Sequence, residues 1–174
     1  MRELGYHKRM STLRFLAHIG LCAILLGTVL AEGARAQNRE VPYWATLRFN
    51  EVNMRVGPSR EYKIEWVYKR KGLPVKVVRV RDSWRLVQDH EGTQGWVAAS
   101  QLDPQLGALI IGDGLADLRA EPGETSALRW RAQPGVVAEL MRCRDTYCEI
   151  DVDGRNGWVS MDRLWGVGEM KPAQ

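Results

Sequence analysis

The chain has 174 residues, of which 25 are Lys or Arg and 21 are Asp or Glu, so its formal net charge is +4. Five of the basic and two of the acidic residues lie in residues 1–36, which leaves 20 basic and 19 acidic residues from residue 37 onward. A net charge this close to zero gives little attraction to phosphates, so we expect no nucleic-acid partner. The length allows one large domain or two small ones.

Residues 1–36 have the order of a secretory signal peptide. Four basic residues in 1–14 precede an apolar run from Phe15 to Ala31, and Ala34-Arg35-Ala36 supplies the small residues of a cleavage site. We expect cleavage after Ala36 and a periplasmic or secreted mature chain without membrane contact. The alternative is an uncleaved anchor, although a run of 17 residues interrupted by His18 is short for a span.

The next segment alternates short strand signals with turn signals. Ala45–Val56 predicts a strand that runs into a loop at the breaker cluster Gly57-Pro58-Ser59. The Val77-Val78 pair interrupts the alternation of a later strand and predicts a β-bulge. Further strands are expected at 64–68, 73–80, 84–87 and from 95, with one helical turn over 98–102. Strands this short indicate a small barrel or sandwich.

The second half of the chain repeats the first. Trp84–Val97 reads W-R-L-V-Q-D-H-E-G-T-Q-G-W-V, and Tyr147–Val159 reads Y-C-E-I-D-V-D-G-R-N-G-W-V. N-M-R-V-G-P at 53–58 likewise corresponds to D-L-R-A-E-P at 117–122. The repeat predicts an all-β chain of two similar units. Their expected spans are 43–103 and 104–168, with a flexible tail at 169–174.

Two cysteines remain once Cys22 leaves with the signal peptide. In an exported chain, Cys143 and Cys148 most simply form a disulfide, and the short connection between them allows them to face each other across a hairpin. Free thiols and a metal site are the alternatives. Zinc sites need four ligands, and no further ligand lies nearby in the sequence. We expect no metal and no cofactor.

The segments I-E-W-V-Y-K-R-K-G-L-P-V-K-V-V (64–78), D-S-W-R-L-V (82–87) and G-T-Q-G-W-V (92–97) resemble the bacterial Src homology 3 (SH3) family. The resemblance is greatest to the tandem exported form typical of alphaproteobacteria, and it covers about residues 45–167. It implies two small, partly open SH3-like β-barrels. It also implies a role in binding the cell wall or a protein.

Catalysis by a cysteine hydrolase is disfavoured. Such an enzyme needs a thiolate beside a histidine. After signal cleavage the only histidine is His90, in the first unit, whereas both cysteines are in the second. We expect no catalytic residues.

The candidate binding residues are aromatic and basic side chains of the first unit. They are Trp66, Tyr68, Lys69, Arg70, Lys71, Trp84 and Arg85. Aromatic rings beside cations can hold an extended peptide and its carboxylates. The sequence therefore predicts a non-enzymatic module that docks on a peptidoglycan peptide or a cell-envelope protein. The alternative is a structural or regulatory interaction subunit without a small ligand.

The other tryptophans are expected to have structural roles. Trp96 and Trp158 follow the same glycine in both copies, so we expect them in the cores. Trp130 and Trp165 have no counterpart in the alignment of the two copies, which makes them candidates for a surface or for contact between the units.

Overall fold

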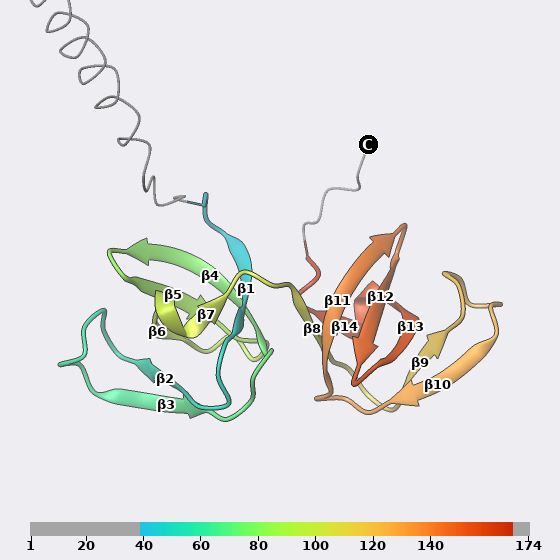
Figure 1. Ribbon diagram of the computed structural model, residues 1–174, viewed down its shortest axis with the longest axis horizontal. Coiled ribbons are helices and arrows are strands. Elements are labelled where there is room, and N and C mark those ends of the chain that lie inside the picture. The colour runs from blue at the N-terminus through green and yellow to red at the C-terminus, as the bar shows by residue number, and fades with distance from the viewer. Residues whose placement is uncertain (1–38, 169–174) are drawn as a thin grey trace, which may run out of the picture. The chain divides into compact units, whose positions relative to one another are not determined.

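The computed structural model describes residues 39–168, in which β-strands form two seven-stranded antiparallel sheets (Figure 1). The only helices in this range are two three-residue 3₁₀ turns, η1 (Ala99–Gln101) and η2 (Met161–Arg163). The predicted all-β fold is therefore confirmed. The expected signal peptide and C-terminal tail lie outside the described residues. Within those residues no helix is long and apolar enough to cross a membrane.

The first sheet contains strands β1 to β7 in the spatial order β3-β2-β6-β5-β4-β1-β7. It is strongly curved but not closed (Figure 1). The strands are β1 (Tyr43–Leu47), β2 (Val52–Arg55), β3 (Ile64–Tyr68), β4 (Pro74–Arg81), β5 (Trp84–Gln88), β6 (Gln94–Ala98) and β7 (Leu102–Asp103).

The second sheet repeats this topology in the order β10-β9-β13-β12-β11-β8-β14. Each strand takes the place of the strand seven positions earlier, so the sequence repeat is a repeat of structure. The strands are β8 (Gly107–Ile110), β9 (Ala116–Arg119), β10 (Leu128–Ala132), β11 (Val137–Arg144), β12 (Tyr147–Val152), β13 (Arg155–Ser160) and β14 (Leu164–Trp165).

Each barrel has its own apolar core, built by alternation along the strands. In β5, Val87 points inward and is fully buried, whereas Trp84 and Leu86 lie on the outer face and are half-buried. Fully buried side chains of the first core are Met54, Val75, Val77, Val87 and Val97, and those of the second include Leu118, Cys148 and Ile150. The predicted bulge is present, since the β4–β5 register shifts between Val77 and Arg79.

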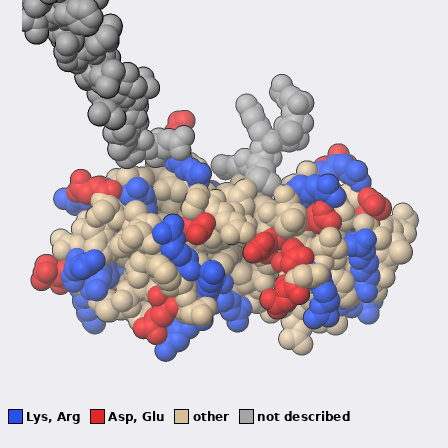
Figure 2. All heavy atoms as spheres, viewed as in Figure 1, with Lys and Arg blue, Asp and Glu red and all other residues tan. Residues whose placement is uncertain are grey.

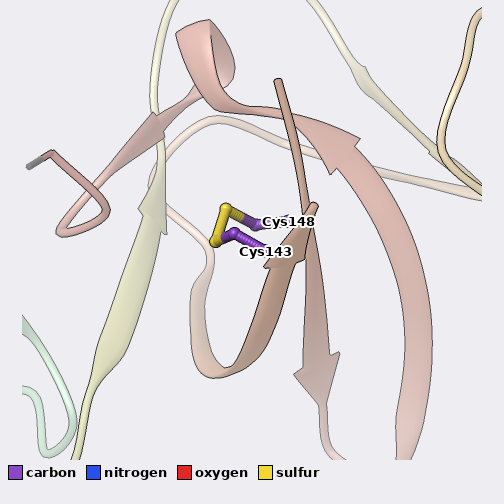
Figure 3. Close-up of a disulfide and its surroundings, with 2 residues drawn as sticks. All are labelled: Cys143 and Cys148. Atoms are coloured by element: carbon purple, nitrogen blue, oxygen red, sulfur yellow. A yellow bond between two sulfur atoms is a disulfide. The ribbon is translucent and has the colours of Figure 1, made fainter. Parts of the chain in front are cut away.

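The hairpin of β11 and β12 carries the predicted disulfide (Figure 3). Cys143 and Cys148 are cross-strand partners with Cα atoms 4.0 Å apart. Cys148 is fully buried in the second core, so the crosslink ties the end of this hairpin to the interior of the barrel.

Trp165 of β14 packs edge-on against Trp44 of β1, with ring centroids 5.0 Å apart. The Trp44 indole N–H donates to the carbonyl oxygen of Gly168 at 2.7 Å. Of the two alternatives predicted for Trp165, a surface position or contact between the units, these contacts agree with the second.

Candidate functional site

A loop over residues 56–63 connects β2 to β3 and is fixed by Arg55. Nη1 of Arg55 donates to the carbonyl oxygens of Arg60 at 3.0 Å and Tyr62 at 2.6 Å. The Tyr62 ring lies directly over Gly57, where an added Cβ would come within 2.6 Å of three ring atoms. A side chain at position 57 would therefore have to displace the Tyr62 ring.

This loop forms one wall of a groove of about 600 Å³ on the first barrel. The other side is built by the β4–β5 turn and by the start of η1. The backbone N–H of Ala99 donates to the Ser83 carbonyl oxygen at 2.8 Å and so joins η1 to this turn. Trp84 of β5 and Ala98 of β6, both in the lining, are cross-strand partners. The complete lining is Pro58, Ser59, Arg60, Asp82, Ser83, Trp84, Ala98 and Ser100. Apolar surface, hydroxyls and charged groups thus lie together in one open groove.

Of the predicted site residues, Trp84 lines the groove and its neighbour Arg85 supports it. Nε of Arg85 donates to the Tyr43 hydroxyl at 3.1 Å. Its Nη1 donates to the carbonyl oxygens of Asp82 and Trp84, both at 2.9 Å. The Arg85 side chain is thereby engaged in holding the turn beside the groove.

Tyr68 is buried, in contrast to the prediction that it contributes to a binding surface. Its side chain is 6% exposed, and its hydroxyl donates to Oδ2 of Asp89 at 2.9 Å. Oδ1 of the buried Asp89 accepts the backbone N–H groups of Glu91 at 3.1 Å and Thr93 at 2.9 Å. Burial, followed by the Asp89 charge, raises the pKa of Tyr68. This pair closes the β5–β6 turn.

The basic run and Trp66 do not line the groove. Lys69 and Arg70 are exposed in the β3–β4 connection, and the Arg70 guanidinium donates to the carbonyl oxygen of Gly135 in the second barrel. Lys71 lines a separate cleft that also contains residues of the second barrel. Trp66, 57% exposed, lies on edge strand β3, which β2 and β6 separate from β5. The structure therefore distributes the predicted face over several locations.

Trp66 has a counterpart in the second barrel, which corrects the sequence alignment. It lies opposite Met54 in the β2–β3 pair, and Trp130 lies opposite Leu118 in the β9–β10 pair. The segments 57–66 and 121–130 share few residue types, so the alignment offered no match for Trp130. The offset of 64 residues that relates Arg55 to Arg119 also relates Trp66 to Trp130, and it is the signal that could have found the match.

Trp158 is buried as predicted, but the side chains that lie over its ring are those of two arginines. The side chain is 4% exposed and lies on the outer face of β13, because Val159 points into the core. The guanidinium groups of Arg142 and Arg144 lie 5.4 and 5.3 Å from its ring centroid. Trp96, its counterpart, is half-buried and lies outside the first core.

Asp117 organises arginines on the second barrel. Its carboxylate is 2.8 Å from both Nη2 of Arg119 and Nε of Arg131. The hydrogen bond from Arg131 lowers the pKa of Asp117. Nη1 of Arg119 donates to the Ser126 carbonyl at 2.8 Å and so fixes this barrel's loop as Arg55 fixes the first.

The cysteines and the histidine of the described residues have the following surroundings. Both cysteines are held in the disulfide, so neither is a free thiol. His90 is an exposed turn residue near Glu91, with Nε2 and Oε1 3.9 Å apart. Within residues 39–168 no three His, Cys, Asp or Glu side chains converge as metal ligands. On the face that Figure 2 shows, basic and acidic side chains are interspersed and form no continuous basic surface.

Two small β-barrels, one with an open surface groove, define a class of binding modules. The family model for the bacterial SH3 domain matches residues 49–104 and again residues 113–166. The chain therefore belongs to the bacterial SH3 domain family, whose members are binding rather than catalytic domains. No curated protein matches this chain.

Three solved structures are partly similar to the chain at 13% sequence identity. NlpC2 from Trichomonas vaginalis gives a TM-score of 0.33 over 71% of this chain and 48% of its own. NlpC1 from the same organism gives 0.32 over 74% and 47%. An NlpC/P60 family protein from Bacillus cereus ATCC 10987 gives 0.32 over 70% and 55%. The chain thus spans about half the length of these structures.

Proposed function

We propose that the chain is an exported, non-enzymatic module that docks on peptidoglycan by holding a peptide in the groove beside Trp84. The observation that supports this proposal is the groove itself. It brings the Trp84 ring together with the hydroxyls of Ser59, Ser83 and Ser100 and the charged groups of Arg60 and Asp82. The family supplies the general role of binding, and the lining residues supply the preference for a peptide.

The lining fits an extended peptide chemically. The Trp84 ring and Pro58 offer apolar contact to side chains, and the hydroxyls of Ser59 and Ser83 can bond to peptide groups. Arg60 adds a cation at the loop wall, where it can meet a carboxylate of a peptidoglycan stem peptide.

A location outside the cytoplasm agrees with the presence of a disulfide. Disulfides persist in oxidising compartments and are rare in the cytosol. The Cys143–Cys148 disulfide together with the bacterial SH3 fold indicates an extracytoplasmic protein. Export through cleavage after Ala36 is part of the proposal.

Retention of the chain from residue 37 onward on purified sacculi tests the proposal. Wild type should sediment with sacculi, and Trp84→Ala should lose most of this retention while both barrels stay folded. Trp66→Ala is the matched control, because Trp66 is an exposed tryptophan of the same barrel outside the groove. Folded wild type that stays in the supernatant would contradict wall binding. Loss with Trp66→Ala alone would place the site on β3 instead.

A further inference from the structure

The second barrel has an ion pair at the place where the first barrel has its groove. Arg144 ends β11, and its Nη2 lies 3.4 Å from Oε2 of Glu121 in the loop between β9 and β10. The Arg144 guanidinium also lies 5.3 Å from the centroid of the Trp158 ring. An exposed carboxylate is therefore held on an arginine that rests on an aromatic ring.

This ion pair joins the loop and the hairpin of the second barrel that correspond to the two sides of the first barrel's groove. Glu121 directly precedes Pro122, which corresponds to Pro58 on the loop wall of the first barrel. Arg144 directly precedes the turn that corresponds to residues 82–83 on the opposite wall. The carboxylate of the loop and the guanidinium of the hairpin thus link these two segments.

The first barrel has the arginine but lacks the carboxylate. Arg81 ends β4 as Arg144 ends β11, and Gly57 occupies the position of Glu121. Arg81 is exposed and forms no ion pair with any residue in the range 39–168. Arg81 is not itself in the groove lining, but it directly precedes Asp82, which is. It is the cross-strand partner of Trp84, so both side chains project from the same face of the sheet at the end of the groove lining.

We propose that Arg81 binds a carboxylate of the ligand, in the place that Glu121 holds on Arg144 in the second barrel. This inference rests on the proposed peptide groove and specifies its ligand as an extended peptide that presents a carboxylate beside the residue packed on Trp84. A guanidinium binds a carboxylate through charge-assisted, often bidentate, hydrogen bonds. In the second barrel Arg144 is already paired with Glu121, so the corresponding site is occupied by a residue of the barrel's own loop.

The aspartate of the β4–β5 turn does not oppose this arrangement. Asp82 lines the groove and places a second carboxylate near the proposed site. Asp145 occupies the same turn position in the second barrel, directly after Arg144, with the same left-handed backbone (φ 54° against 50° for Asp82). The Glu121 carboxylate pairs with Arg144, the residue directly before Asp145, so an acidic group is compatible with the arginine that precedes such a turn.

Titration of the ¹⁵N-labelled chain from residue 37 onward with two blocked dipeptides tests the inference. Acetyl-Glu-Pro-amide reproduces Glu121-Pro122, and acetyl-Gln-Pro-amide has the same shape without the charge. The Trp84 indole and Arg81 side-chain NMR signals should shift with the Glu dipeptide. Binding should be roughly threefold to fivefold weaker for the Gln dipeptide and for Arg81→Ala, as expected for one exposed charge pair.

Two further variants complete the test. Arg79→Ala removes an exposed arginine two residues earlier on the same strand and face, and should leave affinity unchanged. Glu121→Gln should free Arg144, so that the Glu dipeptide also shifts the Tyr147 signals of the second barrel. The inference is overturned by an absence of binding, by equal binding of both dipeptides, or by Arg81→Ala binding like wild type. No sacculi are involved, so failure of wall retention and failure of carboxylate binding are distinguishable.

Discussion

Trp66 and Trp130 occupy the same position in edge strands β3 and β10 but have different surroundings. The Trp130 indole N–H donates to the carbonyl oxygen of Asn156 at 3.1 Å, and the Arg155 guanidinium lies 5.7 Å from the ring centroid. Trp66 is 57% exposed, whereas Trp130 is half-buried. One edge of the second barrel is thus covered by its own side chains, and the same edge of the first is open.

This difference predicts unequal costs of removing the two rings. Trp130→Ala should lower the free energy of unfolding of the second barrel by about 2 kcal/mol, since it loses packing and a hydrogen bond. Trp66→Ala should lower that of the first barrel by less than about 1 kcal/mol, as exposed substitutions do. Urea titration followed by NMR signals of each barrel measures both values. Equal costs would mean that the exposed Trp66 ring packs on the barrel as Trp130 does.

The disulfide predicts a stability effect confined to one barrel. Replacing Cys143 and Cys148 together by alanine should lower the free energy of unfolding of the second barrel by about 2 kcal/mol, because a short closed loop then regains its entropy in the unfolded chain. The urea midpoint of the first barrel, measured in the same titration, should stay unchanged. An unaltered midpoint for the second barrel would show that the crosslink adds no stability.

The repeat and the disulfide could be predicted from the sequence because both depend on local spacing. Turns and alternating strands recur in the same order in the two halves, so the strand sequence of one barrel predicted that of the other. Cys143 and Cys148 flank a tight turn, and pairing across the turn follows from the hairpin register.

The binding surface could not be predicted in the same way. Trp66 and Tyr68 share one face of β3 by alternation, yet Trp66 is exposed at the sheet edge and Tyr68 is buried against Asp89. The groove joins residues 58–60, 82–84 and 98–100, which only the folded topology brings together. Proximity in sequence grouped the basic run with the aromatic residues, whereas the sheet order separates them.

The Tyr68–Asp89 pair predicts a loss of stability at alkaline pH. The pKa of Tyr68 is higher in the folded than in the unfolded state, so the neutral side chain contributes to the free energy of unfolding. This stabilisation is fully present below the pKa of about 10 that Tyr has in the unfolded chain, and it is lost as pH rises above that value. Tyr68→Phe should cost about 1 kcal/mol at neutral pH, where the hydrogen bond is lost, and should reduce the alkaline decline. Thermal unfolding of both proteins between pH 7 and about 11 measures this. If wild type and Tyr68→Phe lose stability equally as pH rises, groups other than Tyr68 cause the alkaline sensitivity.

The Tyr62 ring over Gly57 explains why the first barrel has no carboxylate at that position. An added Cβ would lie 2.6 Å from the ring, so Gly57→Ala must displace the Tyr62 ring from its place in the loop that forms one groove wall. We expect a loss of about 1–3 kcal/mol, typical of overpacking, together with weaker binding in the groove. Protection of the loop amides from hydrogen exchange should fall.

The second barrel indicates how the cost of Gly57→Ala can be relieved. Ser126 stands where Tyr62 stands, which leaves room for the side chain of Glu121. In a Tyr62→Ser background, Gly57→Ala should therefore be nearly neutral, and a double-mutant cycle should give a coupling energy of about 1 kcal/mol or more. Additive effects of the two substitutions would show that the ring does not restrict position 57. The preference for glycine there would then have its origin in the backbone of the loop.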